Sequence, residues 1–149
     1  MTAPFSVRAF RPADLDRILF IEHASFGNDA YDRNLFADFF HKWGDLFLVA
    51  ERRSGVCGYI VTCIRGDRAE LVSIAVDPAA RGRGAASALL AATLRRLRRR
   101  PVSRFGLMVR LSNLPARTFY EKKGFRPIRR VPRYYEDGED GLLMTRHLR

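Results

Sequence analysis

Cysteine and histidine are scarce in this chain. Its two cysteines, Cys57 and Cys63, fall six residues apart in one predicted strand. They share a face of that strand but lie too far along it to form a disulfide bond. We therefore expect both to be small buried residues of a protein from a reducing compartment. The three histidines lie far apart in the sequence, so no metal site is expected.

Long apolar runs are absent from the start of the chain. The N-terminal sequence MTAPFSVRAF predicts neither a signal peptide nor a membrane span. The expected location is cytoplasmic, and no membrane partner is expected. Hydrophobic residues make up 47% and charged residues 29% of the 149 residues, which is typical of a globular protein with its own core. We expect one domain, residues 1–149.

Lysine is rare as well, with three residues among the 27 Lys and Arg. The formal net charge of +11 predicts an anionic ligand or partner. Arginine suits phosphate recognition, although a biased genome composition explains its excess more simply. The arginine run at 95–100 fits either nucleic-acid or ribosome binding or a solvated helix end, where cations offset the helix dipole. The second interpretation is the simpler one, and nucleic acid is not expected as a partner.

Hydrophobic periodicity divides the chain into short strands and helices. Strands are expected at 6–10, 46–52, 56–64, 69–76, 105–109, 125–135 and 142–148. Helices are expected from Pro12 to Phe26, around 35–43, from about 84 to 99 and from 113 to 123. This order predicts an α/β (α+β) protein in which helices cover both faces of a mixed, mostly antiparallel sheet. In the third helix, the inward residues should be Ala86, Leu90, Leu94 and Leu97.

The most informative segment is Val76-Asp77-Pro78-Ala79-Ala80-Arg81-Gly82-Arg83-Gly84-Ala85-Ala86. It follows an apolar strand and leads into an apolar helix. Unpaired backbone N–H groups at a helix N-terminus, together with the positive end of the helix dipole, form an anion site. Gly82 and Gly84 allow the backbone to approach a phosphate closely. The segment therefore predicts a pyrophosphate-binding loop.

Two motifs resemble those of one enzyme family. Val76-x-Pro78-x-x-Arg81-Gly82-x-Gly84-x-Ala86 resembles the acetyl-CoA-binding motif of the GNAT N-acetyltransferases. Asn113-x-x-Ala116-x-x-Phe119-Tyr120-x-x-x-Gly124-Phe125 resembles the second motif of that family, and a helix and a strand separate the two as expected. The resemblance covers most of the chain and looks most similar to the RimI-type enzymes, which acetylate protein N-termini.

The resemblance implies a GNAT fold and a set of donor contacts. The fold would contain about seven strands and about four helices, with the sheet splayed between its fourth and fifth strands. Acetyl-CoA would be the co-substrate, with no metal. Its pyrophosphate would lie on the backbone of Arg81, Gly82, Arg83, Gly84, Ala85 and Ala86, and its pantetheine arm along Ile74, Ala75 and Val76. Asn113, Ala116, Phe119 and Tyr120 would contact the arm from the other side.

The same resemblance implies catalytic roles. Tyr120 shares a helix face with Asn113 and Ala116, and its phenol would protonate the leaving thiolate. A backbone N–H near Val76 would polarise the carbonyl group. RimI-type enzymes carry a carboxylate where this chain has Met108, whereas the histone-type branch uses a glutamate that matches Glu70. Glu70 is therefore the candidate base, acting through water, although a surface role fits it equally well.

The acceptor is less well defined by the sequence. Glu22, Phe26, Tyr31 and Tyr134 fall where the family lines its acceptor site. Neutralising a lysine amine at pH 7 costs roughly 4.6 kcal/mol, and neutralising an α-amine about 1 kcal/mol. A protein or peptide N-terminus, a lysine or a small amine all remain possible acceptors. The chain is interpreted as an acetyl-CoA-dependent N-acetyltransferase, either monomer or homodimer. The alternatives are a non-catalytic acyl-CoA sensor, suggested by Met108, and a nucleic-acid-binding protein.

Overall fold

The structure is a computed structural model that describes residues 5–148. The chain forms two compact units. One consists of Met1–Cys63 and Val72–Arg100, and the other of Ile64–Leu71 and Pro101–Arg149. Strand β4 (Arg68–Val76) runs through both. We describe each unit by itself.

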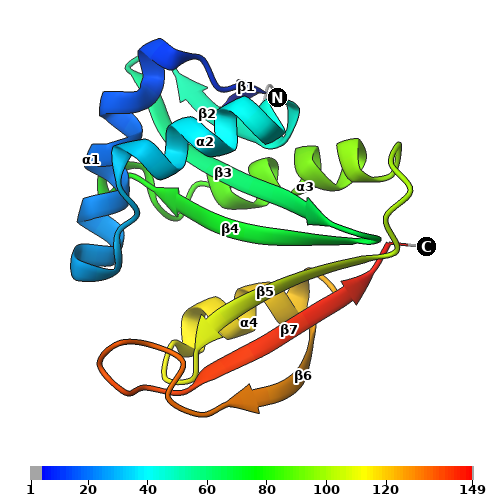
Figure 1. Ribbon diagram of the computed structural model, residues 1–149. Coiled ribbons are helices and arrows are strands. Elements are labelled where there is room, and N and C mark those ends of the chain that lie inside the picture. The colour runs from blue at the N-terminus through cyan, green and yellow to red at the C-terminus, as the bar shows by residue number, and fades with distance from the viewer. Residues whose placement is uncertain (1–4, 149) are drawn as a thin grey trace. The chain divides into compact units, whose positions relative to one another are not determined.

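The strands form a seven-stranded sheet in the order β1-β2-β3-β4-β5-β7-β6 (Figure 1). The antiparallel pairs include β1 with β2, β2 with β3, β5 with β7 and β6 with β7. Strands β4 and β5 pair in parallel, with a register that covers Arg68–Glu70 and Arg104–Gly106. The predicted mixed, mostly antiparallel sheet is thereby confirmed. The strands are β1 (Ser6–Ala9), β2 (Phe47–Arg52), β3 (Gly55–Arg65), β4, β5 (Arg104–Arg110), β6 (Arg126–Val131) and β7 (Gly141–His147).

In the first unit, helices cover both faces of the strands (Figure 1). Helices α1 (Leu15–Phe26) and α2 (Arg33–Trp43) pack with Phe47 and Tyr59 in one buried cluster. Helix α3 (Ala85–Leu97) lies on the opposite face. Gly58 permits this packing, because a Cβ there would lie 3.1 Å from the Ala75 carbonyl oxygen and 3.4 Å from Leu89. The alternation of side chains along β2 and β3 thus divides their residues between two helical layers.

The inward face of α3 differs in part from the sequence prediction. Leu90, Leu94 and Leu97 are buried as expected, but Ala86 is half-buried. Ala85 and Leu89 take the inward position instead. The helix begins at Ala85, and Leu89 packs beside Gly58. This contact sets the rotation of the helix about its axis.

In the second unit, helix α4 (Leu114–Lys122) contributes to an aromatic cluster. Rings of Phe105, Tyr120 and Phe125 lie edge-on or tilted to one another at centroid distances of 5.5 to 5.7 Å. The chain leaves α4 through Gly124, whose φ of 91° is readily adopted by glycine.

Strand β6 ends earlier than the sequence predicts. It stops at Val131, so Tyr134 and Tyr135 lie in the loop before β7. Pro132 lacks a backbone N–H for the ladder, and Arg133 has a φ of 48°, which ends the extended conformation. None of the helices in the described part of the chain is long and apolar enough to cross a membrane.

Candidate functional site

The turn from β4 to α3 carries the predicted anion-binding loop (Figure 1). Pro78–Ala80 form a 3-10 turn, and Gly82 and Gly84 have φ values of 79° and 92°. These left-handed conformations favour glycine. A Cβ on either glycine would meet nothing within 4 Å, so the space beside both is open. Residues 81–84 are exposed, and the loop therefore presents its backbone at the surface of the first unit.

The N–H groups of this loop are largely uncommitted. Among the described residues, no side chain caps the N-terminus of α3. Its first intrahelical bond is donated by Ala88 to the Gly84 carbonyl oxygen, which leaves the N–H groups before Ala88 without intrahelical acceptors. Arg81 differs, because its N–H donates to Pro78 over 3.5 Å. The amides available to an anion therefore begin at Gly82, one residue later than expected.

Asp77 fixes the start of this loop. Its carboxylate accepts hydrogen bonds from the Ala79 N–H at 3.1 Å and from Arg17 of α1. These two donors lower the pKa of Asp77. Arg17 also donates to the Val56 carbonyl at 3.0 Å. The loop is therefore tied both to α1 and to the start of β3.

The side chain of Arg81 folds back onto its own unit. Its Nε donates to the Val76 carbonyl at 3.1 Å, and its Nη2 donates to Ser25 Oγ at 3.3 Å. The last carbonyl of β4 is thus already bonded. Arg83 is exposed and has no hydrogen bond or ion pair to the described residues. It is the cation of this loop whose side chain is available to a ligand.

Glu22 lies inside the first unit. It is 1% exposed, and one carboxylate oxygen accepts hydrogen bonds from the Tyr59 hydroxyl and from Ser73 Oγ. The other oxygen accepts the Tyr31 N–H at 3.0 Å. Burial and the nearby Glu22 charge raise the pKa of Tyr59, which keeps its phenol protonated. Glu22 therefore connects α1, β3 and β4 to the segment that precedes α2.

Two other predicted acceptor residues are partly exposed. Phe26 ends α1 with 40% of its surface accessible, and Tyr31 has 37% accessible. The Tyr31 ring lies edge-on to Phe36, 6.4 Å away. Of the two, only Tyr31 belongs to the segment that Glu22 holds through a backbone N–H.

Glu70 belongs to the second unit and is ion-paired there. Its Oε2 lies 3.2 Å from Nε of Arg65, and both side chains are partly exposed. On the sheet, Glu70 is opposite Gly106 of β5. It is the only carboxylate in the sequence of β4 and β5. The Glu70 carboxylate is therefore already engaged by a cation.

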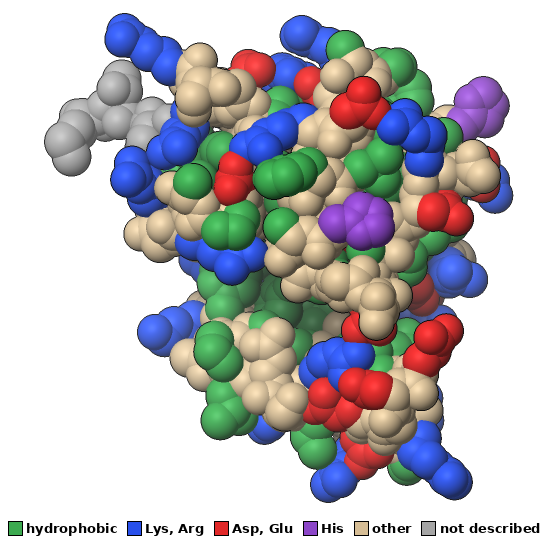
Figure 2. Space-filling model, turned by 90° about the vertical axis from the view of Figure 1, so that its left-hand side faces the viewer, with side chains coloured by type: hydrophobic (Ala, Val, Ile, Leu, Met, Phe, Trp, Pro, Cys, Tyr) green, Lys and Arg blue, Asp and Glu red, His purple; other side chains and the backbone are tan. Residues whose placement is uncertain are grey.

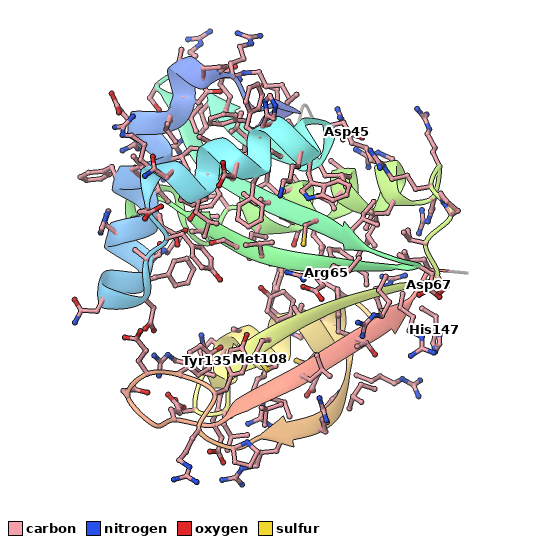
Figure 3. All side chains as sticks on the ribbon, viewed as in Figure 1. Asp45, Arg65, Asp67, Met108, Tyr135 and His147 are labelled. Carbon is pink, nitrogen blue, oxygen red and sulfur yellow. The ribbon has the colours of Figure 1, made fainter. Side chains whose placement is uncertain are left out.

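Met108 lies on β5 opposite Leu143 of β7 and is half-buried (Figure 3). A Cβ on Gly141 would lie 2.7 Å from the Met108 sulfur and 3.1 Å from Tyr134 Cβ. The Met108 side chain thus packs tightly against the Gly141 backbone. The position at which the family resemblance implies a carboxylate is thus filled by an apolar contact.

The N-terminus of α4 is formed as predicted. Asn113 Oδ1 accepts the Ala116 N–H at 3.2 Å, which is the usual role of an N-cap side chain. Asn113 is exposed and Ala116 is half-buried. The amide nitrogen of Asn113 keeps its donors, and the small Ala116 leaves space beside them.

Tyr120 is the most enclosed of the predicted catalytic side chains. It is 8% exposed and lies between Phe119 and Phe125, with ring centroids 5.3 and 5.7 Å away. Burial, with a smaller contribution from Tyr135, raises the pKa of its phenol. The phenol is therefore protonated at neutral pH.

Arg110 organises the loop between β6 and β7. Its Nη1 donates to both oxygens of Asp137, at 3.1 and 2.9 Å, and to Glu139 at 2.8 Å. Glu139 also accepts the Ser112 N–H at 2.9 Å, and these donors lower its pKa to about 2. Figure 2 shows acidic side chains beside basic ones at this end of the molecule. The acidic turn is therefore largely neutralised by arginine, and exposed Tyr134 is carried on an ordered loop.

Tyr59, Ser73 and Arg110 are not among the site residues that the sequence predicts. Tyr59 and Ser73 are polar positions within otherwise apolar strands, a signal for a buried hydrogen-bonded group. Nothing local marks Arg110, whose partners lie 27 and 29 residues away. No group of three or more His, Cys, Asp or Glu side chains that could hold a metal occurs within residues 5–148.

Comparison with known proteins agrees with this geometry. The sequence model of the acetyltransferase (GNAT) family matches residues 13–125. That span contains both motifs and extends over most of the described chain. The protein therefore belongs to the GNAT family of acetyltransferases.

Individual relatives align with this chain over nearly its full length. An N-alpha-acetyltransferase of Saccharolobus solfataricus is 32% identical, covering 97% of this chain and 93% of that protein. A putative [ribosomal protein bS18]-alanine N-acetyltransferase of Bacillus subtilis is 30% identical, covering 97% and 96%. The crystal structure of Ard1 from Thermoplasma volcanium superposes with a TM-score of 0.92 at 30% identity, covering 97% of each chain.

These findings confirm the GNAT fold and the RimI-like resemblance. The chain is an N-acetyltransferase that transfers an acetyl group from acetyl-CoA to an amine. A catalytic role is thereby favoured over a non-catalytic acyl-CoA sensor. The exposed amides after Arg81 and the open space at Gly82 and Gly84 suit the diphosphate of this donor.

Proposed function

We propose that the acceptor is the α-amino group of a polypeptide N-terminus. The observation that carries this proposal is the Arg65–Glu70 ion pair, because Glu70 is the only carboxylate of β4 and β5. With Met108 in place of a second carboxylate, these two strands offer one candidate base, and that base is already paired with a cation. An α-amine is neutralised at pH 7 for about 1 kcal/mol, against roughly 4.6 kcal/mol for lysine. The relatives named for N-alpha and ribosomal-protein alanine acetylation support the same choice.

Donor binding is assigned within each unit. In the first, amides from Gly82 to Ala86 hold the diphosphate, Arg83 adds charge, and Arg81 fixes the loop to Val76. The backbone of Ile74, Ala75 and Val76 pairs with the pantetheine arm. In the second, the free amide donors of Asn113 and the space beside Ala116 serve the same arm, with Phe119 as an apolar neighbour. Two independent motifs of the family support this assignment.

The chemical roles follow from protonation states. The amine attacks the thioester carbonyl, so that the new C–N bond forms and the C–S bond breaks. Glu70 accepts the amine proton through water. Tyr120 donates its phenolic proton to the departing sulfur, since its raised pKa keeps it protonated beforehand. A backbone N–H at the end of β4 polarises the carbonyl group.

The acceptor contacts are assigned to Phe26, Tyr31 and Tyr134, which are exposed aromatic groups. Glu22 is assigned a positioning role, because its carboxylate is bonded within the unit and holds the Tyr31 backbone.

We propose that residues 1–149 act as one acetyltransferase domain, since the family match extends over both units. A cytoplasmic location is proposed because Cys57 and Cys63 are small buried residues of one strand, β3.

The test is a panel of matched acceptors, with CoA release as the readout. One peptide carries a free N-terminus and no lysine, a second has the same sequence with a blocked N-terminus and an internal lysine, and a third acceptor is a polyamine. We expect kcat/KM for the free N-terminus to exceed that of the lysine peptide by roughly 400-fold, from the difference in neutralisation alone. A higher kcat/KM for the lysine peptide or the polyamine would overturn the proposal.

A further inference from the structure

The C-terminal end of α3 carries five arginines in six residues: Arg95, Arg96, Arg98, Arg99 and Arg100. A helix C-terminus favours cations, but arginines one turn apart, such as Arg95 and Arg99, repel each other. The local structure therefore gains little from so many like charges. An external anion would relieve their repulsion.

Asp45 anchors two of these arginines. Arg96 Nη1 donates to the Asp45 carbonyl oxygen at 2.7 Å, and Arg100 pairs with the Asp45 carboxylate. Asp45 lies just after α2, in the turn Gly44–Leu46 (Figure 3). This one carboxylate compensates a small part of the charge.

The other three arginines are exposed. Arg95, Arg98 and Arg99 have no hydrogen bond or ion pair from their side chains to any residue the structure describes. Arg95 lies in the last turn of α3, and Arg98 and Arg99 follow directly after the helix ends at Leu97. Backbone bonds from Arg98 to Leu94 and from Arg99 to Arg96 hold the turn that carries them. The chain thus presents three exposed guanidinium groups from five consecutive residues of hydrogen-bonded backbone.

The surroundings of this arginine cluster select the kind of anion. All the inward side chains of α3 are packed in the core, and the large exposed hydrophobic residues of the described chain lie on other elements. A membrane-surface helix needs an exposed apolar face, and a protein interface usually centres on apolar or aromatic anchors. A nucleic-acid backbone needs neither, because phosphate contacts alone supply affinity. Arginine also pairs with phosphate through two parallel hydrogen bonds.

We propose that Arg95, Arg98 and Arg99 form a docking surface for the phosphodiester backbone of a nucleic acid. The surface belongs to the first unit and is separate in sequence from the donor loop and from every residue assigned to catalysis. It would bring the enzyme to a nucleic-acid-containing assembly without reading base sequence. The sequence alone favours a solvated helix end, and the Asp45 anchor together with the unpaired arginines changes that interpretation.

The test compares two triple variants of the full chain with equal net charge. The first is Arg95→Gln, Arg98→Gln, Arg99→Gln. The matched control removes three other exposed arginines: Arg53→Gln, Arg126→Gln, Arg129→Gln. Fluorescence anisotropy with duplex RNA, single-stranded RNA and duplex DNA between 50 and 200 mM salt gives the slope of log K against log salt. A thermal melt and acetylation of a short peptide establish that each variant is folded and active.

Three phosphate contacts contribute a slope of about −2.7 on a duplex, or roughly a 40-fold loss of affinity over that salt range. We expect the parent and the control to share this steep slope, and the cluster variant to lose it while keeping peptide acetylation. The nucleic acid whose affinity differs most between the parent and the cluster variant identifies the source of the phosphodiester backbone. The proposal would be overturned if both triple variants lost the same affinity, or if the parent did not bind nucleic acid at 150 mM salt. It would also be overturned if binding to phosphatidylserine vesicles or polyglutamate depended on the cluster as strongly as binding to nucleic acid does.

Discussion

The guanidinium carbon of Arg110 lies 4.2 Å from the centre of the Tyr135 ring. The same guanidinium binds Asp137 and Glu139. A strand end, an aromatic ring and an acidic turn are thus joined by one cation, which combines charge pairing with stacking. The loop that carries Tyr134 depends on this arrangement.

Replacing Glu139 with glutamine should make this loop less stable in a pH-dependent way. The pKa of Glu139 is lowered to about 2 from an ordinary 4.5, so the folded state favours its ionised form. Its contribution to stability is present above pH 4.5 and is lost as the pH falls towards 2. Urea midpoints of parent and variant should differ at pH 7 and converge as the pH falls below 4.5. Glu136→Gln, at an exposed neighbour, is the control, and a difference that stays constant with pH would contradict the assignment.

Tyr120→Phe should lower kcat by about 100-fold, since a positioned general acid contributes at least that much. Phenylalanine keeps the packing against Phe119 and Phe125, so the melting temperature and donor KM should stay close to those of the parent. Because the pKa of Tyr120 is raised, its deprotonation should produce no fall in kcat below about pH 10. An unchanged kcat would remove Tyr120 from the mechanism.

Glu70→Gln should lower kcat/KM mainly at low pH, where the acceptor amine most needs a base. Arg65→Gln is the companion variant, because it keeps the Glu70 carboxylate and removes the cation that pairs with it. The measurement is kcat/KM of the free N-terminal peptide from pH 6 to 9. If the profile of Glu70→Gln overlays that of the parent, Glu70 has no role as the base.

Tyr59→Phe should destabilise the first unit by about 1.5–3 kcal/mol, the usual loss for a hydrogen bond to a charged group. A double-mutant cycle with Glu22→Gln separates this pair from its neighbours. We expect a coupling energy above 0.5 kcal/mol from urea unfolding, together with a higher KM for the peptide and an unchanged KM for acetyl-CoA. Additive losses would mean that Glu22 and Tyr59 act independently.

Gly84→Ala should weaken donor binding. Its φ of 92° lies in the left-handed region, where a side chain costs about 1–2 kcal/mol, and the strain would displace the N–H groups that follow. Gly66→Ala, at a positive φ of 62° with similarly open surroundings, imposes comparable strain away from the loop. Calorimetry with CoA should show weaker binding for Gly84→Ala alone. If Gly84→Ala and the parent bound CoA with equal affinity, the loop would have no role in donor binding.

Elements with strong local signals could be predicted from the sequence. The alternating strands and the Gly-rich turn located the sheet, the exposed loop after β4 and α3, and Asn113 marked the start of α4. What escaped prediction depends on contacts distant in sequence. The rotation of α3 is set by Leu89 beside Gly58, and the interior position of Glu22 requires Tyr59 and Ser73 from two strands. The helical spacing of α1 predicts which face of the helix carries Glu22, but it does not predict which residues hydrogen-bond to the Glu22 carboxylate.

The close approach of Met108 to Gly141 also constrains how this chain can change. With the methionine sulfur 2.7 Å from the position of a Cβ on residue 141, any larger side chain at 141 requires the Met108 side chain to move. A shorter carboxylate at 108 would release that restriction. Substitutions at positions 108 and 141 should therefore be energetically coupled, so that alanine at 141 costs less stability when residue 108 is a short carboxylate than when it is methionine.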